Sequence, residues 1–77
     1  MQTNKAFAQR LTEALRLKDL SHAVFAKKLG CAKSTITHYC LGLSDPSVAM
    51  LIKICKELGE SADYLLGLTD DWASFRN

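Results

Sequence analysis

The sequence lacks the marks of several classes of protein. No apolar run approaches the ~20 residues that span a bilayer, and the first ten residues hold no continuous apolar segment like that of a secretory signal. We therefore expect a cytoplasmic protein that does not contact a membrane. The chain also has no glycine-rich phosphate loop, no Ser/His/Asp grouping and no paired catalytic carboxylates. These absences argue against an enzyme and against a small-molecule substrate.

Cysteine is scarce and unpaired. Cys31, Cys40 and Cys55 are an odd number, and none belongs to a C-x-x-C motif. This argues against a disulfide framework and against a structural zinc site. His22 and His38 could join Cys31 and Cys40 around a metal, but that spacing fits no familiar ligand pattern. We expect free thiols packed as small apolar groups, with no metal and no cofactor.

Strand patterns are missing as well, because the β-branched residues are scattered rather than alternating. Apolar residues instead recur at helical spacing. They predict five helices, over residues 4–18, 22–29, 33–41, 48–58 and 62–66 or 62–67. Short turns between these helices predict an all-α, compact five-helix bundle. The second and third helices are joined too tightly to lie antiparallel, so they should cross steeply as a helix-turn-helix.

Capping residues mark the ends of these helices. Polar residues suited to cap a helix start are Asn4 or Thr3, Ser21, Ser47 and Ser61. Glycines that can leave a helix in the left-handed conformation are Gly30, Gly42 and Gly59. Pro46, the single proline, separates the third helix from the fourth because proline cannot continue a helix.

The formal net charge of +2 conceals an uneven distribution. Residues 1–44 hold seven basic and two acidic side chains, whereas residues 45–77 hold three basic and six acidic ones. A basic half suits a polyanion such as a phosphate backbone, and an acidic half would face away from it.

Residues 21–42 carry the most specific pattern: a small Ala26 where a helix crosses closely, Gly30 at the turn, and Ile36 between the two helices. This segment resembles the lambda-repressor-like (Cro/XRE) family of helix-turn-helix regulators. The matching positions are Phe25-Ala26, Gly30, Ser34-Thr35-Ile36-Thr37, Gly42 and Pro46, and Ser61–Gly67 is similar to the last helix of the family. The resemblance extends over about residues 7–68.

Four features depart from the family pattern. His22 stands where the family usually has a glutamine that contacts a phosphate and braces the reading helix; histidine can still donate, with pH dependence. Ala32 replaces the usual serine cap of the third helix. Leu15 and Cys40 together replace an Arg–Glu pair, and we expect both in the core, close to each other. Leu41 replaces a polar phosphate contact.

The resemblance implies that the third helix enters the major groove of DNA. Carried over position by position, the expected base contacts are Lys33, Ser34, Thr35, Thr37 and His38. The expected phosphate contacts are His22, Lys27, Ser44 and Ser47. Lys27 and Lys28 would act through their charge, and a solvated helix face is the alternative for at least one of them. Tyr39 shares the register of Ile36 and is expected in the core.

The function that this resemblance implies is a sequence-specific transcriptional regulator, a phage- or plasmid-like repressor binding a palindromic operator in double-stranded DNA as a homodimer. Residues 1–68 would form the DNA-binding domain and residues 69–77 a C-terminal tail. The alternative is an antitoxin-like or adaptor domain whose main partner is a protein. Candidates for the dimer surface are Trp72 and Phe75 together with Tyr64, Leu65 and Leu68; packing of these side chains onto their own domain is the alternative.

Overall fold

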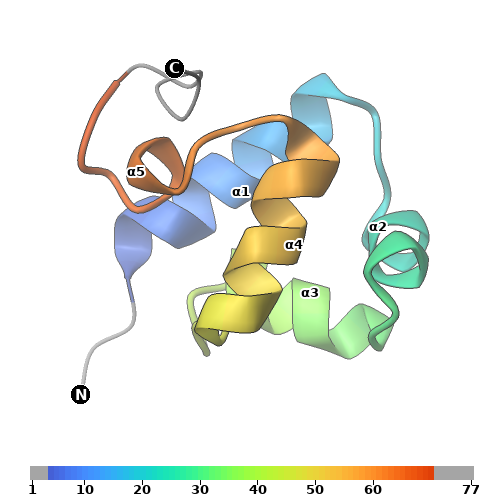
Figure 1. Cartoon of the computed structure of the whole chain (residues 1–77). Helices are drawn as coiled ribbons and strands as arrows, with labels where there is room; N and C mark the ends of the chain where they lie inside the picture. Colours follow the sequence, from blue (N-terminus) through green and yellow to red (C-terminus); the bar gives the residue numbers. More distant parts are fainter. Residues whose placement is uncertain (1–3, 71–77) are drawn as a thin grey trace.

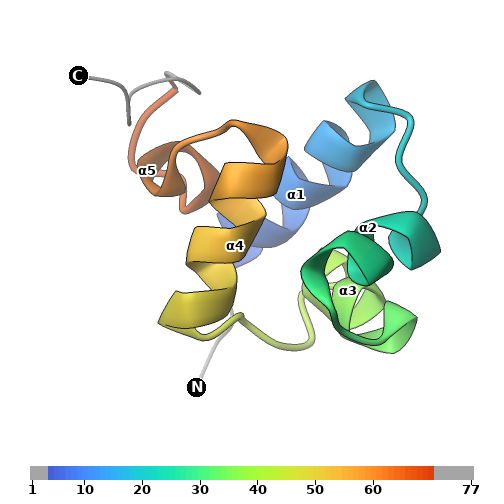
Figure 2. The same ribbon diagram turned by 45° about the vertical axis from the view of Figure 1, so that its right-hand side comes forward.

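The computed structural model describes residues 4–70 and consists of five helices (Figures 1 and 2). They are α1 (Lys5–Leu17), α2 (His22–Leu29), α3 (Lys33–Cys40), α4 (Val48–Leu58) and α5 (Ala62–Leu65). No strand occurs within the described residues. The predicted all-α five-helix bundle is therefore confirmed, and its helix bounds agree with the sequence prediction to within one residue, taking residue 66 as the predicted end of α5.

Local capping explains where four of the helices begin. A side-chain oxygen accepts a hydrogen bond from the backbone N–H three residues further on, which satisfies one of the free donors of the first turn. The pairs are Asn4 with Phe7, Ser21 with Val24, Ser47 with Met50 and Ser61 with Tyr64, at 2.9–3.1 Å. Only α3 starts without such a bond, because Ala32 has no side-chain acceptor.

The turn between α2 and α3 depends on Gly30. Its φ of 76° is left-handed, a conformation that glycine adopts without steric cost. The Cys31 N–H then reaches back to the Ala26 carbonyl oxygen at 3.0 Å, which closes the end of α2. The chain thereby changes direction within the three residues that separate α2 from α3 (Figure 1).

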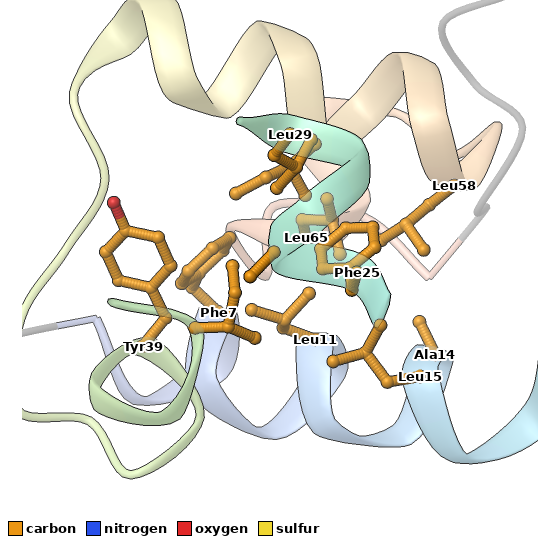
Figure 3. Close-up of a cluster of buried hydrophobic side chains, with 12 residues drawn as sticks. Phe7, Leu11, Ala14, Leu15, Phe25, Leu29, Tyr39, Leu58 and Leu65 are labelled. Carbon is orange, nitrogen blue, oxygen red and sulfur yellow. The ribbon is translucent and has the colours of Figure 1, made fainter. Parts of the chain in front are cut away.

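Every helix contributes a fully buried side chain to the core, and α1 contributes two. These are Phe7 and Leu11, Phe25, Ile36, Ile54 and Leu65, each no more than 1% exposed. Figure 3 shows the cluster of buried side chains from several helices, with the hydroxyl of Tyr39 pointing away from it. Tyr39 is buried, as predicted, and packs edge-on against Phe7 with ring centroids 6.0 Å apart. The core fixes how α3 sits on the rest of the domain.

The structure corrects the prediction that Leu65 of the fifth helix could form part of a dimer surface. Leu65 is fully buried, so it is unavailable for a dimer surface. Its neighbour Tyr64 is half-buried at the edge of the core and lies beneath the Arg10 guanidinium, 4.2 Å from the ring centroid. Leu68 is exposed. Trp72 and Phe75 lie outside the described residues.

Arg10 holds the end of the fold together. Its guanidinium donates to the carbonyl oxygens of Tyr64 and Thr69 at 2.8 and 2.6 Å, and to the Asp70 carboxylate at 2.9 Å. These bonds fasten the segment after α5 to α1.

The three cysteines are free and half-buried against the core rather than fully buried. Burial raises the pKa of the Cys55 thiol, and it raises the pKa of the Cys40 thiol despite an opposing hydrogen bond from Thr12. Thiols held in the protonated form are poor nucleophiles, in line with a packing role. Within residues 4–70, no helix has the length and apolar character needed to cross a membrane.

Candidate nucleic-acid interface

The third helix has one buried and one polar side. Ile36 is fully buried and Tyr39 nearly so, and both face the core. Lys33, Ser34 and His38 are exposed on the other side. Helix α3 packs against both α1 and α2, so its polar side is carried on a supported backbone. A helix held in this way can present the same side chains in the same positions to a groove.

Two predicted site residues are bonded to each other. Nδ1 of His22, the first residue of α2, lies 2.9 Å from Oγ1 of Thr37 in the middle of α3. Both side chains are half-buried. The contact joins α2 to α3 across the helix-turn-helix. His22 thus braces α3, the role that the resemblance gives to the glutamine at this position.

Of the remaining predicted base contacts, Lys33, Ser34 and Thr35 lie near the start of α3, and His38 lies in its last turn. Thr35 is half-buried, which leaves it less available than Lys33 or Ser34. The backbone at this end is ordered by a 3.0 Å hydrogen bond from the Thr35 N–H to the Ala32 carbonyl oxygen. No side chain caps the remaining N–H groups, so the first turn of α3 keeps donors that can face an anion.

The predicted phosphate contacts lie around this helix. Ser44 is half-buried in the segment between α3 and α4, and Ser47 is exposed at the start of α4 while it caps that helix. Lys27 is exposed in the last turn of α2. Its neighbour Lys28 is also exposed and lines a depression with Lys53, Lys56 and Glu57 of α4.

One candidate was not predicted from the sequence. Lys5 and Gln9 of α1 line a shallow depression of about 290 Å³ together with Leu41 and Gly42, which follow α3. The depression brings a basic residue of the first helix next to the end of α3. In the sequence, the only sign of this basic site is the excess of basic residues in the first half of the chain.

The two residues that replace the family's ion pair both lie inward. Leu15 is buried, and Cys40 is half-buried against the same core cluster. The contact seen at Cys40 is with α1, where Oγ1 of Thr12 lies 3.4 Å from its carbonyl oxygen. The apolar pair therefore leaves no unpaired charge between α1 and α3. Within residues 4–70, no group of three His, Cys, Asp or Glu side chains could hold a metal ion.

Comparison with known proteins gives a family match. A family model described as Helix-turn-helix (HTH_3) matches residues 11–65. A curated protein of Bacillus subtilis strain 168, the uncharacterized HTH-type transcriptional regulator YobD, is 34% identical over 65 residues, or 84% of this chain. The chain spans 58% of the length of that relative.

Solved structures share the fold. SinR, described as the master regulator for biofilm formation in complex with DNA, matches with a TM-score of 0.72 and 31% identity, over 78% of this chain and 97% of SinR. The hydroxypropylphosphonic acid epoxidase of S. wedmorenis matches with a TM-score of 0.75 and 25% identity, over 83% of this chain and 34% of the enzyme. The likeness to this epoxidase is confined to about a third of its chain.

Proposed function

The chain belongs to the HTH_3 helix-turn-helix family, as its resemblance to the Cro/XRE regulators led us to expect, and from that premise we propose that it is a sequence-specific DNA-binding transcriptional regulator. The observation that carries the proposal is the polar, exposed side of α3, which is supported from behind by α1 and α2. The likeness to SinR, whose structure was determined with DNA, supports it.

The proposed reading mechanism places the polar side of α3 in the major groove. Lys33 and Ser34 are the primary base contacts, with Thr37 and His38 one turn later and Thr35 at the margin. Lys33 can donate to O6 and N7 of guanine, and the methyl group of Thr37 can meet the methyl group of thymine.

Contacts to phosphates would position the domain without reading sequence. We assign these contacts to His22, Lys27, Ser44 and Ser47, and add Lys5 from α1. The uncapped N–H groups at the start of α3 are further donors. Because each neutralised phosphate releases counterions, binding should weaken steeply with salt.

One small domain offers less contact area than specific binding usually needs, which is about 1,000–2,500 Å² of protein surface. We therefore propose a homodimer on a palindromic operator, with half-sites about one helical turn apart. A phage- or plasmid-like repressor acting in the cytoplasm fits this arrangement, with residues 1–68 as the DNA-binding domain.

Selection of bound duplexes from a random DNA pool tests the proposal. We expect enrichment of a short motif, and a loss of affinity for it of about 10- to 100-fold when Lys33→Ala and Ser34→Ala are combined. Lys53→Ala removes an exposed positive charge on α4 and serves as the matched control. Equal affinity of the double variant and the control would contradict the proposed reading role.

A second candidate is a protein-interaction domain of the antitoxin or adaptor type. It is favoured by two apolar side chains next to the polar side of α3: Leu41 is 66% exposed and Leu43 is 65% exposed. If no motif emerges from the random pool while Leu41→Ser and Leu43→Ser abolish binding to a captured protein, this second function replaces the first.

A further inference from the structure

An apolar groove of about 540 Å³ runs along α4 as far as the start of α5. It lies outside the candidate DNA-binding residues. The side chains that matter for its chemistry are Val48, Leu51, Ile52, Cys55, Lys56 and Glu60. Four of these are apolar, and the two charged ones have opposite signs.

Three of these residues form a line along α4. Val48, Ile52 and Lys56 are four residues apart in turn, a spacing that places them on one side of a helix. Val48 is 75% exposed and Ile52 is 50% exposed. The core needs neither of them, because α4 buries Ile54 and Leu58 instead. Large apolar side chains gathered around a groove mark an interaction surface.

The charged end of the groove has unused bonding capacity. Neither Lys56 nor Glu60 forms an ion pair with another residue in the part of the chain that the structure describes. Oε1 of Glu60 is shielded from solvent and has no hydrogen-bond donor among these residues. Lys18 attracts the Glu60 carboxylate without bonding to it. The exposed Lys56 ammonium is left for an outside partner, and the half-buried Glu60 carboxylate has no hydrogen-bond donor of its own for the shielded oxygen within this part of the chain.

We propose that a second copy of this chain docks on this groove. A two-fold interface brings each surface patch against itself, so residue i of one copy meets residue j of the other and the reverse. Here Val48 and Ile52 meet their own counterparts, while Lys56 of each copy reaches Glu60 of the other. The patch supplies every group that it requires, whereas an unrelated partner would have to offer an apolar strip and both charges in matching positions.

The position of the groove suits the proposed dimer on DNA. Helix α4 starts near the level of α3 and leads away from it in both views (Figures 1 and 2). A two-fold axis parallel to α4 therefore keeps the two α3 helices at the same end of the pair, as one face of a duplex requires. The placement of the two α3 helices on one duplex rests on the proposed function, but the association of two copies can be measured without DNA.

Sedimentation equilibrium of the full chain tests the association. Ile52→Lys should raise the dimer dissociation constant about tenfold or more, because the two-fold axis introduces the change twice. Leu17→Lys is the matched control: Leu17 is 69% exposed and lies at the end of α1, outside the groove. Circular dichroism verifies that both variants are folded. Equal dissociation constants for the two variants would overturn the proposal.

A charge exchange tests the reciprocal pairing. Lys56→Glu and Glu60→Lys should each weaken association, because each places like charges opposite one another. An equimolar mixture of the two variants restores both pairs in a heterodimer and should recover most of the lost affinity. Without recovery in the mixture, the reciprocal arrangement is wrong.

Two further outcomes identify another occupant or no occupant. If Ile52→Lys shifts the fluorescence of Trp72, the single tryptophan, in solutions dilute enough to be monomeric, the C-terminal residues of the same chain cover the groove and the proposal fails. It also fails if the wild-type chain stays monomeric at millimolar concentration and binds two half-sites without cooperativity.

DNA binding separates this inference from the proposed function. Ile52→Lys should keep the wild-type affinity for a duplex with one half-site and lose the cooperative gain on two. Loss of binding to a single half-site as well would assign Ile52 to the DNA contact and overturn the docking surface. If no selected duplex binds while Ile52→Lys still prevents self-association, the proposed function falls and the docking surface stands.

Discussion

The imidazole of His22 and the hydroxyl of Thr37 are joined at 2.9 Å, which ties the first residue of α2 to the middle of α3. Fifteen residues separate the two in sequence. Both were predicted to contact DNA, one at a phosphate and the other at a base. In the proposed complex this bond would couple the two contacts, because a shift of His22 toward a phosphate would also move the Thr37 side chain.

The first prediction concerns this bond. Thr37→Val keeps the shape of the side chain and removes the hydroxyl. It should lower the affinity for a selected duplex by about 5- to 30-fold, the equivalent of about 1–2 kcal/mol, because one hydrogen bond is lost and α3 is no longer braced by His22. Fluorescence anisotropy with labelled duplex measures the change. Thr37→Ser retains the hydroxyl and should bind nearly as well as the wild type; a loss equal to that of Thr37→Val would mean that the methyl group, and not the bond, matters.

The second prediction concerns the uncapped start of α3. Ala32 has the extended backbone of a capping residue, with φ −78° and ψ 149°, but no acceptor. Ala32→Ser should raise the free energy of unfolding by about 1 kcal/mol, which corresponds to a rise in Tm of about 5 °C for a domain of this size. Thermal unfolding followed by circular dichroism measures it. Ser21→Ala, which removes an existing cap, should give a change of similar size and opposite sign, and no gain in Ala32→Ser would contradict the capping argument.

The third prediction concerns the turn after α5. Gly67 has a φ of +83°, and a Cβ added there would lie 2.6 Å from Cβ of Ala6. Gly67→Ala therefore combines left-handed strain with a collision against α1. Gly30→Ala is the control, since Gly30 has a φ of +76° and nothing within 4 Å of the added atom. Strain alone should cost Gly30→Ala about 1–2 kcal/mol, and crowding should add a further ~1–3 kcal/mol in Gly67→Ala. Urea unfolding distinguishes them, and equal losses would mean that α1 moves aside freely.

The fourth prediction concerns pH. Burial raises the pKa of the Glu60 carboxyl, although the positive charge of Lys18 acts in the opposite direction. The folded chain therefore holds this proton more tightly than the unfolded chain does. Between the ordinary glutamate pKa of about 4.3 and the raised value, stability must fall as the pH rises, because the folded state has more protons bound.

Glu60→Gln removes that titration. Its free energy of unfolding should exceed that of the wild type at neutral pH and approach it in acid below the ordinary glutamate range. Urea unfolding at several pH values, in solutions dilute enough to be monomeric, measures the difference. A variant less stable than the wild type at neutral pH would show that the attraction of Lys18 outweighs the burial of the carboxylate.

Features that depend on neighbours in sequence were predictable. Four caps, the left-handed Gly30 and the buried side of α3 follow from local residue types, and the family pattern over residues 21–42 gave the helix-turn-helix. Ala32 was expected to leave α3 uncapped, and it does. These inferences need only the chemistry of a few consecutive residues.

Features that depend on how helices pack were not predictable. Leu65 and Leu68 look alike in sequence, but only Leu65 points into the core. The depression shared by Lys28 and α4 arises from the packing of α2 on α4, which the sequence does not specify. The groove on α4 could not be predicted, because apolar residues at helical spacing are usually buried, whereas Leu51 and Cys55 are only half-buried. Exposure of a helix side is a tertiary property.

The hydrogen bonds from Arg10 to Thr69 and Asp70 have a practical consequence for the design of C-terminal fusions. The chain reaches residue 70 at the end of the molecule away from α3 (Figures 1 and 2). A fluorescent protein or affinity tag fused to the C-terminus is therefore connected to the domain through residue 70, on the side away from α3. Replacing Arg10 with alanine would remove the bonds to Thr69 and Asp70 and so loosen the point at which the added protein is joined to the domain.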